Sequence, residues 1–179
     1  MNRLNVPSFD NAPEASKPTL EAVNKKLGVV PNLFRLIASS PAALAGYMGF
    51  NGALTKALDA KTRERIALAV AQVNGCDYCL SAHTYIGLNM LKITPEEIAL
   101  NRKGKSDDAK ANAAVHFAAA VALARGKVSD DEIRAVRDAG FSDAQIVEIV
   151  AMVADNTFTN YLNNVALTEV DFPVVHANE

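Results

Sequence analysis

With 179 residues, half of them hydrophobic, this chain can bury a core of ordinary size and is expected to form one domain or two small halves. Eighteen basic and twenty acidic residues give a net charge of −2, which provides no electrostatic footprint for nucleic acid. The sequence contains no run of about eighteen apolar residues, so no membrane-spanning helix is expected.

The first segment, residues 1–18, is polar and contains three prolines. It predicts an extended N-terminal arm ahead of a single helical domain over residues 19–179. The arm has no apolar stretch of the kind that a secretory signal needs. We therefore expect a cytoplasmic protein, in which thiols are kept reduced and a permanent structural disulfide is disfavoured.

The rest of the chain shows apolar residues at helical spacing and typical helix boundaries. Gly28 stops a first short helix, and Asn74–Gly75 is a natural break between two longer ones. Capping-box patterns open three further helices, at Thr94, Ser129 and Ser142. The predicted helical segments are, in order, 18–28, 30–39, 40–58, 59–75, 76–92, 94–98, 107–126, 129–140 and 142–158.

No segment shows a convincing alternation of apolar and polar residues, so the predicted fold class is all-α. Residues 171–178 predict only a short extended tail. Residues 65–83 and 148–166 are weakly similar, with Ile66, Val70 and Tyr78 repeated in the second copy. This similarity predicts a degenerate internal helical-hairpin repeat, of which only the first copy carries chemistry.

Both cysteines of the chain lie in one short motif, "NGCDYCLSAH", residues 74–83. If a helix restarts near Cys76, both thiols lie where free backbone N–H groups and the positive end of the helix dipole stabilise a thiolate. A CxxC motif at a helix N-terminus is a recurrent reactive arrangement. Asp77 works against it, because a nearby negative charge disfavours a second one.

His83 and Glu64 are candidate partners of these thiols. His83 follows Cys79 by four residues, so the two side chains share a helical face and the imidazole can act as a general base. If the two helices run antiparallel from Asn74–Gly75, Glu64 lies about 15 Å back along one and His83 about 12 Å along the other, at ~1.5 Å per residue. We therefore expect the Glu64 carboxylate to orient the imidazole.

Other roles for the cysteine pair have to be weighed. Zinc would need a fourth ligand or a water beside Cys76, Cys79 and His83, and the two other histidines, His116 and His176, do not belong to a second ligand pair. An inert buried pair is a further alternative. The spacing excludes attachment of a c-type haem, because no histidine directly follows Cys79.

The spacing of Glu64, Cys76, Cys79 and His83 resembles the signature of the AhpD-like alkylhydroperoxidases in the carboxymuconolactone decarboxylase superfamily. The similarity extends more loosely from residue 30 to residue 166. It implies an all-α AhpD-like fold and a catalytic set in which Cys79 attacks a hydroperoxide, Cys76 resolves the sulfenic acid to a disulfide, and Glu64 and His83 relay protons. Characterised AhpD has a histidine where this chain has Tyr78.

We therefore expect a thiol-dependent peroxidase, with a hydroperoxide as substrate and a dithiol as reductant. The resemblance implies that a lipoyl-bearing protein supplies this dithiol. No nucleotide, flavin or haem motif is present, so no cofactor or metal is expected. A non-enzymatic redox sensor and a lactone decarboxylase-type relative are the alternatives, although the latter chemistry does not use a CxxC motif.

Self-association is also expected. The Ala-rich helix at 107–125 suggests apolar faces beyond those that one small domain can bury, and the resemblance implies a trimer or hexamer.

Overall fold

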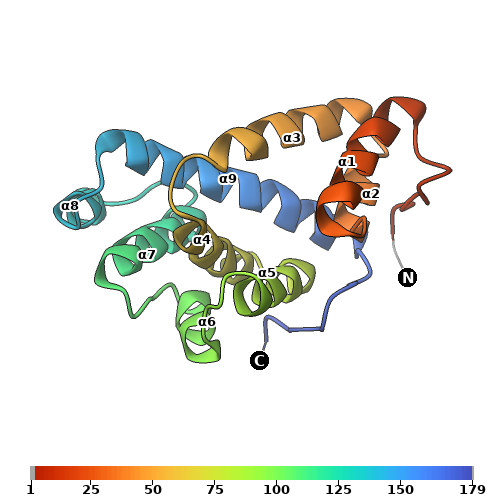
Figure 1. The fold of residues 1–179 in the computed structure, drawn as a ribbon. Helices are drawn as coiled ribbons and strands as arrows, with labels where there is room; N and C mark the ends of the chain where they lie inside the picture. The colour runs from red at the N-terminus through yellow and green to blue at the C-terminus, as the bar shows by residue number, and fades with distance from the viewer. Residues whose placement is uncertain (1–2, 179) are drawn as a thin grey trace.

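The fold is organised around one central helix, α4, in the computed structural model of the chain, which describes residues 3–178 (Figure 1). Helices α5, α6, α7 and α9 pack around α4. The described residues form helices and no strand, which confirms the all-α fold class. The elements are η1 (Glu14–Ser16, a 3-10 turn), α1 (Lys17–Leu27), α2 (Asn32–Ile37), α3 (Pro41–Leu54), α4 (Ala60–Val73), α5 (Asp77–Asn89), α6 (Pro95–Arg102), α7 (Ala109–Ala124), α8 (Asp130–Asp138) and α9 (Asp143–Ala166).

Helix boundaries follow the polar residues of the sequence. Ser129 and Ser142 form complete capping boxes at the starts of α8 and α9, as predicted. Thr94 caps α6 through the backbone N–H of Glu97, 3.2 Å away. The Glu97 side chain does not complete a capping box there, because its carboxylate is bound elsewhere.

Three apolar clusters fill the interior. The largest lies between α4, α7, α8 and α9, the second contains both cysteines between α4, α5 and α6, and the third joins the N-terminal segment to α2 and α3. Much of the apolar face of α7 is buried in the largest cluster, whereas Leu123 near its end is exposed, and self-association stays a prediction.

The expected second hairpin is not formed, and this part of the repeat prediction is wrong. Helix α9 is continuous over Asp143–Ala166, well past the predicted end at residue 158. In the first copy the chain turns at Gly75, whose φ is +61°. The matching position in the second copy is Phe158, which has no such preference for a left-handed backbone, and the helix continues.

The N-terminal arm and the C-terminal tail both pack on the chain itself. Within the described part of the arm, Ser16 donates from its hydroxyl to the Ala38 carbonyl at 2.8 Å, and α1 already begins at Lys17. The division into an arm over 1–18 and a domain over 19–179 stays a prediction; residues 1, 2 and 179 lie outside the described residues. None of the helices in residues 3–178 is both long and apolar enough to cross a membrane.

Candidate functional site

The two cysteines lie at the tight turn between α4 and α5. The backbone N–H of Cys76 donates to the Ala71 carbonyl at 3.0 Å, and Gly75 takes the left-handed conformation that this helix ending requires. Cys76 is the N-cap of α5, and its Sγ accepts a hydrogen bond from the Cys79 backbone N–H at 3.2 Å. The first thiol therefore sits on the free N–H groups of the helix, as predicted.

Cys76 and Cys79 form a disulfide in this structure, with their Cα atoms 5.3 Å apart. Cys76 is fully buried and Cys79 is 3% exposed. The Asn163 side chain, on α9, donates from Nδ2 to Cys79 Sγ at 3.4 Å. Both sulfur atoms thus have a hydrogen-bond donor of their own.

Glu64 and His83 are in direct contact across α4 and α5. His83 Nδ1 lies 2.8 Å from Glu64 Oε1, and both side chains are largely buried. This contact is the one that the antiparallel arrangement of the two helices predicts. When Nδ1 carries the proton and donates it to the carboxylate, Nε2 is left to accept a proton.

A second carboxylate, Asp155 on α9, acts on the same imidazole. Burial alone lowers the pKa of His83, but the charge and hydrogen bond of Glu64 and the charge of Asp155 raise it, and the net direction is upward. Burial raises the pKa of Asp155, although a hydrogen bond from Asn51 Nδ2 at 2.8 Å and the His83 charge oppose this. The charges of two carboxylates therefore act on this one imidazole.

A cavity of about 140 Å³ adjoins the Glu64–His83 pair. It has room for a few water molecules or the head of a small polar ligand. Its described lining contains no cysteine, so the cavity approaches the site from the imidazole rather than from the disulfide. The lining residues are Asn51, Leu54, Thr55, Arg63, Glu64, Ala67, His83, Met152, Asp155 and Asn156.

The C-terminal tail is fixed to the start of α5 through Asp77, the residue after the first cysteine. Asp77 accepts a hydrogen bond from the Ala177 backbone N–H at 2.9 Å and pairs with His176 Nδ1 at 2.8 Å. Burial raises the pKa of Asp77, but these two contacts outweigh that effect and lower it. The charge that was expected to oppose a thiolate is thus partly compensated by the tail.

Tyr78 stands between the cysteines and is buried. Its ring packs edge-on against Phe172 of the tail, with 5.9 Å between ring centroids. Its hydroxyl accepts a hydrogen bond from the Leu33 backbone N–H at 3.1 Å. Burial raises the pKa of Tyr78, so the phenol is neutral and serves as a packing residue that joins α2, α5 and the tail.

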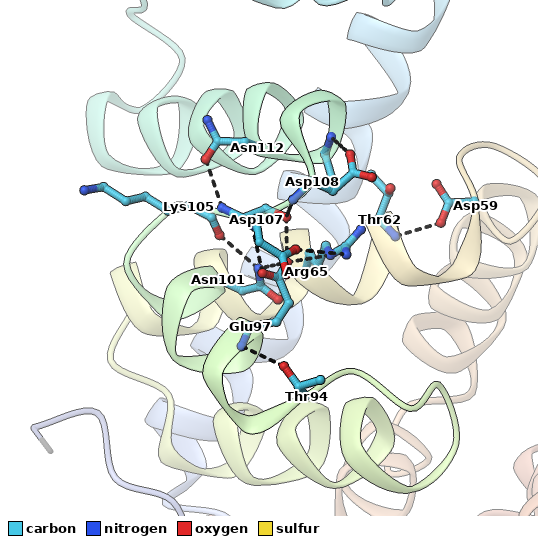
Figure 2. Close-up of polar contacts among 12 residues, drawn as sticks. Asp59, Thr62, Arg65, Thr94, Glu97, Asn101, Lys105, Asp107, Asp108 and Asn112 are labelled. Carbon is cyan, nitrogen blue, oxygen red and sulfur yellow. Dashed lines mark hydrogen bonds and ion pairs between the residues drawn. The ribbon is translucent and has the colours of Figure 1, made fainter.

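A buried polar network, shown in Figure 2, holds α4 against α6 directly beside the site. Arg65, the neighbour of Glu64, pairs through Nε with Glu97 Oε1 at 2.8 Å. Burial alone raises the pKa of Glu97, but hydrogen bonds from the Ser106 hydroxyl, the Asp107 backbone and the Asn101 amide lower it to about 2. The charged network therefore fixes the part of α4 that carries Glu64.

The structure joins the four residues singled out from the sequence in two contacting pairs on the adjoining helices α4 and α5: Cys76 with Cys79, and Glu64 with His83. Their catalytic roles remain predictions. Among residues 3–178, no group of three or more His, Cys, Asp or Glu side chains is placed to hold a metal ion.

Helix α9 contributes buried polar residues that were not predicted from the sequence. Asp155, Thr159, Asn160 and Asn163 are all buried on the face that meets α4 and α5. A signal for them was present, because these polar residues continue the helical spacing of the buried Ile149 and Met152. Polar residues on the inner stripe of a helix are costly unless they serve a partner.

The chain is similar to a known protein family and to several solved structures. Residues 41–124 match the model of the carboxymuconolactone decarboxylase family. No curated protein is significantly similar in sequence.

Similar solved structures cover nearly the whole chain. A peroxidase-related protein from Ralstonia eutropha JMP134, described as an alkylhydroperoxidase AhpD core, is 26% identical over 95% of this chain and 92% of its own, with a TM-score of 0.83. A peroxidase-related protein from Silicibacter sp. TM1040 is 24% identical over 94% of this chain and 91% of its own, with a TM-score of 0.79. The debrominase Bmp8, in complex with 2,3,4-tribromopyrrole, is 17% identical over 96% of this chain and 94% of its own, with a TM-score of 0.78.

Proposed function

Because residues 41–124 form a carboxymuconolactone decarboxylase family domain within an AhpD-like fold, we propose that this chain is a thiol-dependent peroxidase that reduces a hydroperoxide with its cysteine pair. The single observation that supports this most is the juxtaposition of a cysteine pair at a helix N-terminus with a buried Glu64–His83 pair one turn further on. The peroxidase-related names of the similar structures agree with it.

The proposed cycle begins with the reduced dithiol. His83 takes the proton of Cys79, and the thiolate attacks the terminal oxygen of the hydroperoxide. The O–O bond breaks, the alcohol leaves with a proton returned by the imidazole, and Cys79 becomes a sulfenic acid. The Cys76 thiolate then attacks this sulfur, the S–S bond forms, and the hydroxyl leaves as water.

The disulfide in this structure corresponds to the end of that sequence. Two electrons and two protons from an external dithiol restore both thiols, so the overall reaction turns hydroperoxide and dithiol into alcohol, water and disulfide. We propose a lipoyl-bearing protein as the dithiol donor. A cytoplasmic location fits this proposal, because such reductants are maintained there.

The cavity beside His83 supports a small, uncharged substrate. Its lining contains two carboxylates, Glu64 and Asp155, and one guanidinium, Arg63, which donates a hydrogen bond to the Leu58 carbonyl. A neutral hydroperoxide can donate its O–H to either carboxylate.

A homo-oligomer, a trimer or hexamer by resemblance, forms part of the proposal. Exposed apolar side chains recur along the outer face of α9 and could meet a second copy. They are Val147, Val150, Phe158, Tyr161 and Val165.

Steady-state consumption of hydrogen peroxide and a small alkyl hydroperoxide tests the proposal, with dihydrolipoamide, thioredoxin and glutathione compared as reductants. Turnover that requires a dithiol and is absent from Cys79→Ser is the expected result. If the pair forms and breaks its disulfide but no reductant sustains turnover, the redox-sensor alternative is favoured instead.

A further inference from the structure

We propose that Asn163 is a further catalytic residue of this site, one that stabilises the Cys79 thiolate by donating a hydrogen bond from its amide to the sulfur. The inference rests on the proposed thiol chemistry of the cysteine pair. It names a group from α9, a helix that lies outside the 41–124 family match.

The geometry assigns this bond to one atom pair. Asn163 Nδ2 lies 3.4 Å from Cys79 Sγ, and the Asn163 side chain is 3% exposed. The other end of the amide, Oδ1, finds no hydrogen-bond partner within residues 3–178. The side chain is therefore not held by a network of its own, and its hydrogen bond in the described structure goes to the sulfur.

Burying such an amide lowers the stability of the fold if the side chain serves only for packing. A buried polar group with one unmet partner costs free energy that an apolar side chain of similar size avoids. Asn163 is only 3% exposed and keeps its amide all the same, which makes a functional reason for the amide the better account.

The amide favours the reduced, ionised form of Cys79 over the disulfide. A disulfide sulfur is a neutral, weak acceptor, whereas a thiolate carries a full charge and forms a stronger, charge-assisted hydrogen bond. Cys76 already has the Cys79 backbone N–H as its donor. Asn163 supplies the equivalent donor to the second sulfur, both when that sulfur attacks a peroxide and when it leaves a disulfide under attack by a reductant.

Titratable groups on the neighbouring elements are the same in every variant compared below. They are Glu64 on α4, His83 on α5, Asp155 on α9, and the Asp77–His176 pair of α5 and the tail. A change in the ionisation of Cys79 between variants that differ only at residue 163 therefore reports on the amide itself.

The test measures alkylation of Cys79 by iodoacetamide from pH 5 to 10, in a Cys76→Ser background in which Cys79 is the only thiol. Asn163→Leu should slow alkylation at pH 7 by about tenfold, because it removes a hydrogen bond to a charged group. The rise of the rate should move toward the free thiol value of about 8.5. Asn163→Asp, which keeps the shape and replaces the donor by a carboxylate, should slow it further.

Asn164→Leu is the matched control, because Asn164 donates to the Asn74 carbonyl at 2.9 Å and not to a sulfur. It should leave the alkylation profile unchanged. Circular dichroism and thermal melting verify that each variant is folded. If Asn163→Leu does not fold, the alkylation profile of Asn163→Asp alone tests the inference.

Alkylation needs no peroxide, so it separates this inference from the proposed function. A shifted profile supports the role of Asn163 even in a protein that proves not to be a peroxidase. Profiles of Asn163→Leu and Asn163→Asp that coincide with that of Asn163 itself would overturn the inference, whatever the turnover of the wild-type protein.

Discussion

The Glu97 network offers a direct test of how charge stabilises this fold. Glu97 is 4% exposed and receives hydrogen bonds at 2.6 to 2.9 Å from Ser106, Asp107 and Asn101, in addition to its ion pair with Arg65. Glu97→Gln removes the negative charge and puts an N–H₂ group where donors converge. We expect this substitution to destabilise the protein near neutral pH.

The magnitude follows from the pKa of Glu97, which the network lowers from an ordinary value of 4.5 to about 2. A difference of this size corresponds to about 3 kcal/mol in the free energy of unfolding. Because the folded-state pKa lies below the unfolded-state value, the contribution is fully present above about pH 4.5 and is lost as the pH falls through about 2.

Urea unfolding at pH 7, 5 and 3 measures the effect, with Glu96→Gln as the matched control. Glu96 is the exposed neighbour on the same helix, and its substitution should change the free energy of unfolding by less than about 0.5 kcal/mol. The difference in free energy of unfolding between wild type and Glu97→Gln should be about 3 kcal/mol at pH 7 and should be smaller at pH 3. An equal stability of the two proteins at pH 7 would refute the reasoning.

Four further substitutions test individual features of the site. Asp155→Asn should lower the pKa of His83, because the Asp155 charge raises it, and an NMR titration that shows no downward shift would contradict this. Gly75→Ala should destabilise the protein by ~1 kcal/mol, because the φ of Gly75 is +61° and an alanine is strained in this conformation. The added Cβ meets no other atom within 4 Å, so backbone strain is the only cost expected. An unchanged melting temperature would contradict this. His83→Ala and Glu64→Gln should each slow the peroxide reaction by ~10²–10⁴-fold in stopped-flow measurements without abolishing it, and wild-type rates would exclude the relay.

The part of the site built by local chain geometry could be predicted from the sequence. Gly75 defines the turn between α4 and α5, and helical rise then brings Glu64 level with His83, as observed at 2.8 Å. Cys76 as N-cap of α5 follows from the same turn. Each of these placements depends on neighbours within about twenty residues along the chain.

The part contributed by distant segments could not be predicted. Asp155 and Asn163 reach the site only because α9 packs across α4 and α5, and no local pattern states which partner a buried polar residue will meet. The expectation of a second hairpin was wrong for a related reason, since apolar periodicity was repeated at residues 148–166 but the turn residue was not. The contact between Asp77 and His176 of the tail joins residues 99 positions apart, so it could not be predicted from the sequence either.

One measurement tests the central claim most directly: mass spectrometry of reduced Cys79→Ser and Cys76→Ser after one equivalent of hydroperoxide. We expect that Cys79→Ser does not react, and that Cys76→Ser reacts once and stops as a sulfenic acid on Cys79 or its over-oxidised product. Sulfenic acid trapped on Cys76 in Cys79→Ser, formed at the rate of the wild-type reaction, would contradict the assignment of Cys79 as the attacking thiol.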